Sequence, residues 1–179
     1  PNASHYYGFD IENNNLKLAE LNLVLNGDGG AVLKNMNSIS QKLLENGSIL
    51  KVGEFIISNF ETETWQHKDD TEKELKKFKK IATKPPFGKA RDLKTGKEGK
   101  WDVAKETVEL YETHKVKPTP NSKGQITLPN SMDMGVIFLE NAYKLLEEGG
   151  RMGIVLSNSI ASISEWENVR KWLIERMRI

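Results

Sequence analysis

The segment best suited to do chemistry is Ile81–Gly88 (IATKPPFG), a short strand-like run that ends in two prolines and an aromatic residue. Neither Pro85 nor Pro86 has a backbone N–H, so neither extends a helix or a central strand, and the backbone is held extended. Nearby carbonyls stay available as acceptors, and Phe87 offers a flat aromatic face beside them. A planar base with an exocyclic amine can stack on such a ring and donate to a carbonyl. A rigid turn with a buried phenylalanine is an equally good interpretation of these residues alone.

A second candidate is the carboxylate near the end of the first apolar run, His5–Ile11 (HYYGFDI). In nucleotide-binding α/β folds, ligands lie beyond the carboxyl ends of the strands, where a carboxylate can accept hydrogen bonds from ribose hydroxyls. Asp10 has that position, and Glu12 is the alternative. The competing interpretation is a helix N-cap or a solvated charge.

The sequence lacks the motifs of phosphate-binding loops, serine nucleophiles and metal sites. Neither GxGxxG nor GxxxxGK[ST] nor GxSxG occurs, and His5, His67 and His114 do not have metal-binding spacing. We therefore expect no metal site. Cysteine is absent, which excludes a thiol nucleophile and fits a reducing, cytoplasmic location. No apolar run approaches the roughly 18 residues that would indicate a membrane span, so we expect no membrane association.

The elements that must position these residues alternate along the chain. Asn13–Asn15 offer an N-cap for a helix. This helix has two apolar stripes, which predicts burial on more than one side, and Gly27 is placed to end it. The remaining expected strands are 31–33, 53–59, 81–83 and 152–156. The expected helices are a turn or two at 38–44 and the longer segments 67–80, 101–114, 134–148 and 165–177; Gly149–Gly150 close the helix at 134–148. The expected loops are 89–100 and 116–130. Such alternation predicts an α/β fold with a mostly parallel sheet and helices on both faces.

Longer stretches resemble the modification subunits of type I restriction systems. IATKPPFG resembles the (Asn/Asp)-Pro-Pro-(Tyr/Phe) motif of amino-methylating DNA methyltransferases. Tyr6–Gly27 (YYGFDIENNNLKLAELNLVLNG) is similar to the segment after their glycine-rich donor motif, and Met132–Ser159 is similar to their later helix and strand, which end L-x-x-G-G-R-x-x-x-V-L. Order and spacing agree over most of the chain, and the combination is typical of the N6-adenine class.

This resemblance implies a Rossmann-like fold that uses S-adenosylmethionine as methyl donor. Residues 1–179 would be part of one catalytic domain, cut from a longer protein after the donor glycine motif. Asp10, with Ile11 beside it, would bind the donor's ribose, and Asn37 its adenine, with Asp28 as another candidate for that contact. A piece that lacks the glycine motif should bind the donor weakly or not at all.

The resemblance also implies how a target base is held. The carbonyl of Pro85 would accept from N6 of a flipped adenine, Pro86 would complete the rigid turn, and Phe87 would stack on the base. The partners would be double-stranded DNA and the specificity and restriction subunits. The charge pattern is compatible with DNA: the net charge is +1, yet positions 84–100 hold six basic residues (Lys84, Lys89, Arg91, Lys94, Lys97, Lys100) against Asp92 and Glu98. A solvated loop is the competing interpretation.

One departure from the family bears on activity. Lys84 stands where the family has asparagine or aspartate, whose oxygen accepts from the amino group being methylated. A charged lysine has only donors, so it cannot accept that hydrogen bond. Lys79 and Lys80 also occupy a stretch where the family usually has an aspartate. We therefore expect impaired methylation, and keep a catalytically silent DNA- or subunit-binding scaffold as the alternative. A generic nucleotide-binding domain would be favoured if Phe87 were buried.

Overall fold

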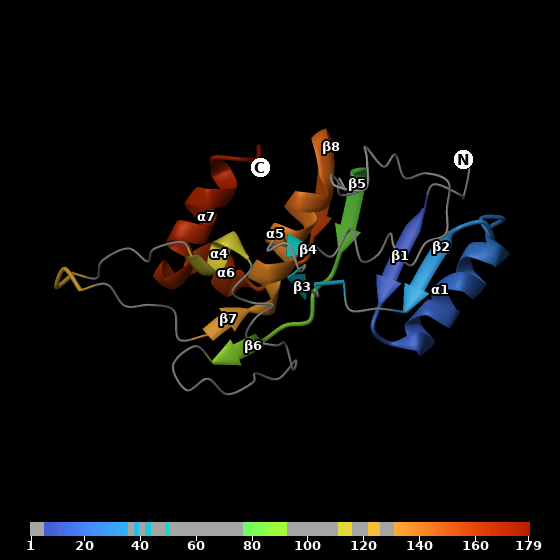
Figure 1. Cartoon of the computed structure of the whole chain (residues 1–179), viewed down its shortest axis with the longest axis horizontal. Helices are drawn as coiled ribbons and strands as arrows, with labels where there is room; N and C mark the ends of the chain where they lie inside the picture. Colours follow the sequence, from blue (N-terminus) through green and yellow to red (C-terminus); the bar gives the residue numbers. More distant parts are fainter. Residues whose placement is uncertain are drawn as a thin grey trace. The chain divides into compact units, whose positions relative to one another are not determined.

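The computed structural model describes residues 6–35, 38–39, 42–43, 49–50, 77–92, 111–115, 122–125 and 131–179. The chain divides into two compact units, Pro1–Ser40 and Gln41–Ile179, and each is described by itself (Figure 1). In the described ranges, no helix is long and apolar enough to cross a membrane.

The first unit is a strand–helix–strand motif. Strand β1 (Tyr7–Asp10) is followed by helix α1 (Asn13–Leu25) and strand β2 (Val32–Asn35). The strands pair in parallel, with Tyr7 opposite Val32 and Asp10 opposite Asn35, and α1 makes the crossover that parallel strands require (Figure 1). The predicted strand and helix are thus confirmed, and the expected short strand at 31–33 is found one residue later.

The end of α1 is set by Gly27, as predicted. Its φ of 79° lies in the left-handed region that favours glycine. The N–H of Asp28 donates to the carbonyl of Leu23 at 2.8 Å, and the N–H of Gly27 donates to that of Val24 at 3.0 Å. This pair of bonds is the Schellman arrangement, which satisfies carbonyls that a helix end leaves open.

Two expectations about α1 are wrong. The N-cap residue is Glu12, whose side chain makes no capping bond, and Asn13–Asn15 form the first turn instead. The two apolar stripes are not both buried: within this helix only Leu16 is buried, whereas Leu18, Leu21, Val24 and Leu25 are exposed. The reason is that a pair of strands covers only one side of a helix.

The second unit is built around a parallel pair, β5 (Phe78–Thr83) and β8 (Leu146–Ile154), with Ile81 opposite Met152 and Thr83 opposite Ile154. Strands β6 (Lys89–Asp92) and β7 (Ser131–Asp133) pair antiparallel, as do the short strands β3 (Lys42–Leu43) and β4 (Ile49–Leu50). Strand β6 overturns the expected loop at 89–92, and β3 overturns the helical turn expected within 38–44. Strand β7 is not predicted by the sequence. With four and three residues, β6 and β7 are too short for an alternation of polar and apolar side chains to predict them.

The helices of this unit carry the core. They are α4 (Glu112–Lys115), α5 (Met134–Leu145), α6 (Asn158–Ser162), the 3₁₀ turn η2 (Ser164–Trp166) and α7 (Glu167–Ile174). Helix α5 buries most of its length, and Trp166, Val169 and Trp172 are buried near the chain's end. The stripe predicted for 134–148 is therefore confirmed as the central core helix.

Several boundaries differ from expectation, and the strand expected at 152–156 is β8, Leu146–Ile154. Helix α5 ends at Leu145, because Leu146 is extended and starts β8, so Gly149–Gly150 lie inside the strand rather than at a helix end. Residues 78–80 belong to β5 and not to the expected charged helix. The last helix is shorter than 165–177, since η2 precedes it. The strand at 53–59, residues 67–76 and 101–110, most of the 116–130 loop, Asn37 and the lysines at 94, 97 and 100 lie outside the described residues.

Candidate active site

The Pro-Pro-Phe segment leaves the carboxyl end of β5. Because β5 and β8 are parallel, the ends of both strands meet at one edge, and the carbonyl of Thr83 accepts from the N–H of Val155 at 3.1 Å. The segment therefore starts at the edge where α/β folds bind ligands.

Burial alternates sharply along this segment. Pro85 is less than 2% exposed, whereas the side chain of Phe87 is 52% exposed. The interpretation as a rigid turn with a buried phenylalanine is wrong, and with it the generic nucleotide-binding domain loses its support. A buried proline anchors the turn, and about half of the surface of Phe87 beyond it is exposed to solvent.

The segment is fixed at its far end as well. Gly88 has a φ of 127°, a conformation that L side chains rarely adopt. Its carbonyl accepts from the N–H of Met134, the first residue of α5, at 3.0 Å. Phe87 is thus held between the β5–β8 bond on one side and the start of α5 on the other.

Lys84, the first residue after β5, is exposed to solvent. Lys79 and Lys80 are also exposed, on β5 itself. The side chain at position 84 brings a cation to the start of the turn instead of an acceptor.

In the first unit, Asp10 is half-buried at the carboxyl end of β1. Its Oδ1 accepts from the N–H of Glu12 at 2.7 Å, and its Oδ2 accepts from Nδ2 of Asn15 at 3.1 Å. The carboxylate therefore binds a backbone N–H and a side chain at the start of α1. This resembles the N-cap interpretation, although the N-cap residue itself is Glu12. Each oxygen keeps a second lone pair, so the group still fits two ribose hydroxyls.

Asn35 is a residue of this edge that sequence reasoning missed. Its Nδ2 donates to the carbonyls of Asp10, at 3.2 Å, and Ile11, at 2.8 Å, and so joins the ends of β1 and β2. The side chain of Ile11 is 65% exposed beside them. The available signal was an amide residue two positions after the expected strand 31–33.

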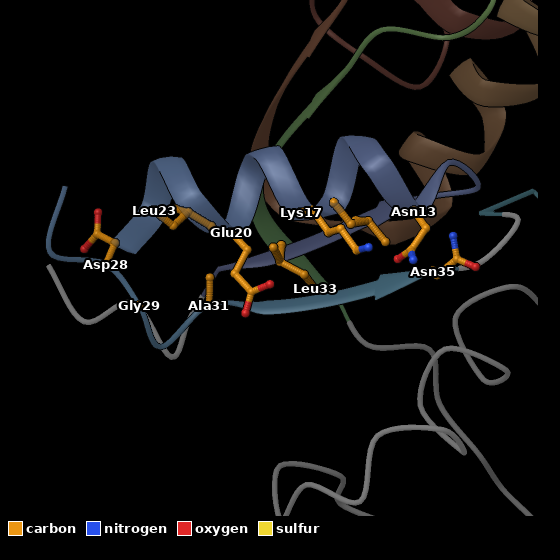
Figure 2. Close-up of a pocket in the computed structure, with 10 residues that line it drawn as sticks. Asn13, Lys17, Glu20, Leu23, Asp28, Gly29, Ala31, Leu33 and Asn35 are labelled. Atoms are coloured by element: carbon orange, nitrogen blue, oxygen red, sulfur yellow. The ribbon is translucent and has the colours of Figure 1, made fainter. Parts of the chain in front are cut away.

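A cavity of about 240 Å³ lies between α1 and β2 (Figure 2). Asn13 and Asn35 line one end, and Asp28 and Gly29 line the other. Asp28 precedes β2, so it lies at the opposite end of the unit from Asp10. This position argues against Asp28 as a partner of Asp10 in one donor site.

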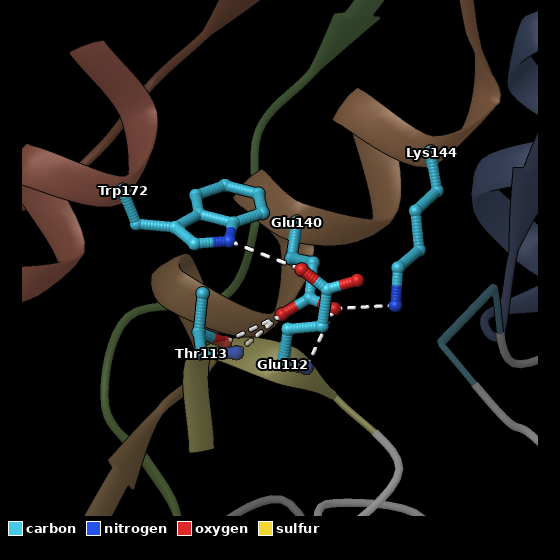
Figure 3. A network of polar contacts seen from close by, with 5 residues as sticks. All are labelled: Glu112, Thr113, Glu140, Lys144 and Trp172. Carbon is cyan, nitrogen blue, oxygen red and sulfur yellow. Dashed lines mark hydrogen bonds and ion pairs between the residues drawn. The ribbon is translucent and has the colours of Figure 1, made fainter. Parts of the chain in front are cut away.

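A second polar cluster lies in the core of the larger unit (Figure 3). Glu140 of α5 is fully buried. Its Oε1 accepts from the N–H of Glu112 and pairs with Lys144, while its Oε2 accepts from the N–H and hydroxyl of Thr113, each of these hydrogen bonds being 2.8 Å long. Trp172 Nε1 donates to Oε2 of Glu112 at 3.2 Å. All these partners come from the chain itself, so the cluster fastens α4 and α7 to α5 and is not a ligand site.

A comparison with protein-family models matched residues 4–179 to the Eco57I restriction-modification methylase family. No curated protein and no solved structure matches the chain. The match covers nearly the whole sequence, and the chain belongs to this family. Its activity class is that of a restriction-modification DNA methyltransferase, and membership implies S-adenosylmethionine as the methyl donor.

Proposed function

We propose that residues 1–179 form part of the catalytic domain of an adenine-N6 DNA methyltransferase with a Rossmann-like fold, and that Lys84 impairs its activity. The observation that carries the proposal is the exposed Phe87 behind the buried Pro85, at the carboxyl edge of a parallel strand pair. A half-exposed aromatic side chain next to a proline turn suits a planar base that has left the DNA stack.

Each residue of the turn has one role in this proposal. Phe87 stacks on the flipped adenine, the carbonyl of Pro85 accepts from its N6 amine, and Pro86 keeps the turn rigid. The adenine nitrogen then attacks the donor methyl directly. No covalent enzyme intermediate is needed, because the sulfonium donor is already activated, so the protein contributes position and polarisation.

Asp10 is the proposed ribose ligand of S-adenosylmethionine. Its carboxylate is held by Glu12 and Asn15 and retains acceptor capacity for hydroxyl donors. Ile11, exposed next to it, and Asn37 complete the proposed donor contacts. The resemblance to type I modification subunits extends the proposal to double-stranded DNA as substrate and to specificity and restriction subunits as partners.

Lys84 favours a second candidate function, a catalytically silent scaffold that binds DNA or a partner subunit. A lysine beside phosphates is favourable, whereas a lysine beside a nitrogen that becomes positive during methyl transfer is not. The two functions separate cleanly, because only the methyltransferase regains activity when an acceptor replaces the lysine.

The test is isotope-labelled methyl transfer to mixed-sequence DNA by the full-length protein, with Lys84→Asn as the active form, followed by nucleoside mass spectrometry. We expect label in N6-methyladenine and none in methylated cytosines. Phe87→Ala should abolish it, and Phe87→Tyr, which keeps the ring, should retain it. Label in cytosine refutes the adenine assignment, and DNA binding without any label in either form supports the scaffold.

A further inference from the structure

The junction between β7 and α5 lies directly against the Pro-Pro-Phe segment. Asp133 ends β7 opposite Lys89, the second residue after Phe87, and is also the N-cap of α5. Its Oδ1 accepts from the N–H of Gly135 at 2.7 Å. The N–H of Met134, between them, donates to the carbonyl of Gly88 at 3.0 Å.

The first N–H groups of a helix have no partner inside it. In α5, the N–H of Gly135 donates to the side chain of Asp133, and the N–H of Met134 donates to the carbonyl of Gly88, the residue after Phe87. The direction of the Met134 N–H follows from the first turn of α5, which the carboxylate of Asp133 fixes. The carboxylate that caps α5 and the carbonyl of Gly88 therefore bind successive N–H donors at the start of the same helix.

Gly135 shows that this first turn is tightly packed. A Cβ at this position would lie 2.8 Å from Ile160 Cδ1, 3.0 Å from Asp133 Oδ1 and 3.1 Å from Leu156 Cδ2. Leu156 and Ile160 belong to the chain that leaves β8 at the same edge, and Arg170 donates to the carbonyl of Ile160 at 2.8 Å. The turn thus has little freedom to move while the cap is present.

We infer that Asp133 is a positioning residue for Phe87: its carboxylate orders the start of α5, and the Met134–Gly88 bond transmits that order to the aromatic ring. This inference deepens the proposed function, on which its catalytic consequence rests. Asparagine at position 133 offers the same acceptor, whereas alanine offers none.

The structural arm places 4-fluorophenylalanine at position 87 of the full-length protein and records ¹⁹F NMR spectra. Asp133→Ala should shift or broaden the resonance, and Gly135→Ala, which displaces the carboxylate, should do the same. Asp133→Asn should leave it within the linewidth. The control is Gly149→Ala in β8, away from the Pro-Pro-Phe segment. The new Cβ would meet nothing within 4 Å, and alanine would strain only the local backbone, because φ at this position is 73°.

The inference fails if Asp133→Ala leaves the signal as Gly149→Ala does, or if Asp133→Asn disturbs it as much as alanine. The kinetic arm uses the Lys84→Asn background. There Asp133→Ala should lower kcat by about tenfold or more with the donor KM unchanged, since small misplacement of a reacting group is costly, and Asp133→Asn should restore it. If the Lys84→Asn protein transfers no methyl group at all, the proposed function fails, while the fluorine spectra still decide the positioning role.

Discussion

Replacing Glu140 by glutamine should destabilise the protein far more than its small change in shape suggests. The carboxylate is fully buried and takes hydrogen bonds from the N–H groups of Glu112 and Thr113, from the Thr113 hydroxyl, and an ion pair from Lys144. A glutamine has one acceptor oxygen, so its NH₂ must face one of the two groups of donors. With the oxygen toward Glu112 and Lys144, the hydroxyl of Thr113 can rotate to accept, but the N–H of Thr113 loses its partner.

The magnitude follows from that count. An unsatisfied buried N–H costs about 1–3 kcal/mol. Removing one partner of a buried ion pair costs about 3–5 kcal/mol in full. Because glutamine keeps a dipole toward Lys144, we expect a total of about 2–4 kcal/mol, and alanine at the upper end or beyond. At about 2–4 °C per kcal/mol for a chain of this size, the glutamine variant should melt about 5–15 °C lower.

The assay is differential scanning calorimetry of the full-length protein, with Glu167→Gln as the matched control. Glu167 has the same i,i+4 pairing with a lysine, Lys171, at 2.8 Å, but on the surface. Water and salt screen such a pair, so the melting temperature of this control should not change measurably. Equal melting temperatures for the two glutamine variants would refute the view that the Glu140 cluster fastens α4 to the core.

Three further changes have defined outcomes. Burial raises the pKa of Asp133 above its ordinary 3.8; repulsion from Glu165 adds to this rise, and the hydrogen bond from Gly135 opposes it. The stability that the protonated Asp133 contributes is therefore complete below pH 3.8 and is lost as the pH rises through the raised pKa. The melting temperature of Asp133→Asn minus that of the wild type should thus increase from about pH 3 to neutrality, and a difference that does not change with pH refutes this. Gly27→Ala should cost about 1 kcal/mol in urea unfolding, because a Cβ there meets nothing within 4 Å and only the φ of 79° is strained, whereas Gly27→Asn should cost less. Asp10→Asn should weaken S-adenosylmethionine binding to the full-length protein by about 10–100-fold in calorimetry, because one or two hydrogen bonds to a charged group contribute binding free energy of that size. Glu12→Gln should bind the donor normally. The reverse pattern would make Glu12 the ribose ligand.

The strand–helix–strand unit could be predicted because its signals are local. An apolar run, helical spacing and Gly27 each indicate their element without help from the rest of the chain. Strand β6 could not be predicted, since Lys89–Asp92 pairs through its backbone with a segment some forty residues later, and four residues with a single apolar side chain, Ala90, do not form a strand pattern. The end of α5 was misplaced for the same reason: helical spacing continued past Leu145, but pairing with β5 prevailed.

The candidate site was predictable in composition but not in exposure. Two consecutive prolines and an aromatic residue identified the turn, yet their sequence suits a buried Phe87 as well as the exposed one. The bonds that hold the turn, from Met134 to Gly88 and from Val155 to Thr83, join residues far apart in sequence. Asn35 and Glu140 were missed because a single polar residue in an apolar pattern does not reveal the backbone groups that it will meet.

Methyl transfer by the wild-type protein and its Lys84→Asn variant tests the central claim most directly. Both full-length proteins are given DNA and S-adenosylmethionine, and N6-methyladenine is counted over time. One preorganised electrostatic contact is worth about 10²–10³ in rate, so the variant should be faster by about that factor while DNA affinity changes little. Equal rates would contradict the account, because position 84 would then not be the place of the amine acceptor and the assignment of the Pro-Pro-Phe turn would be wrong.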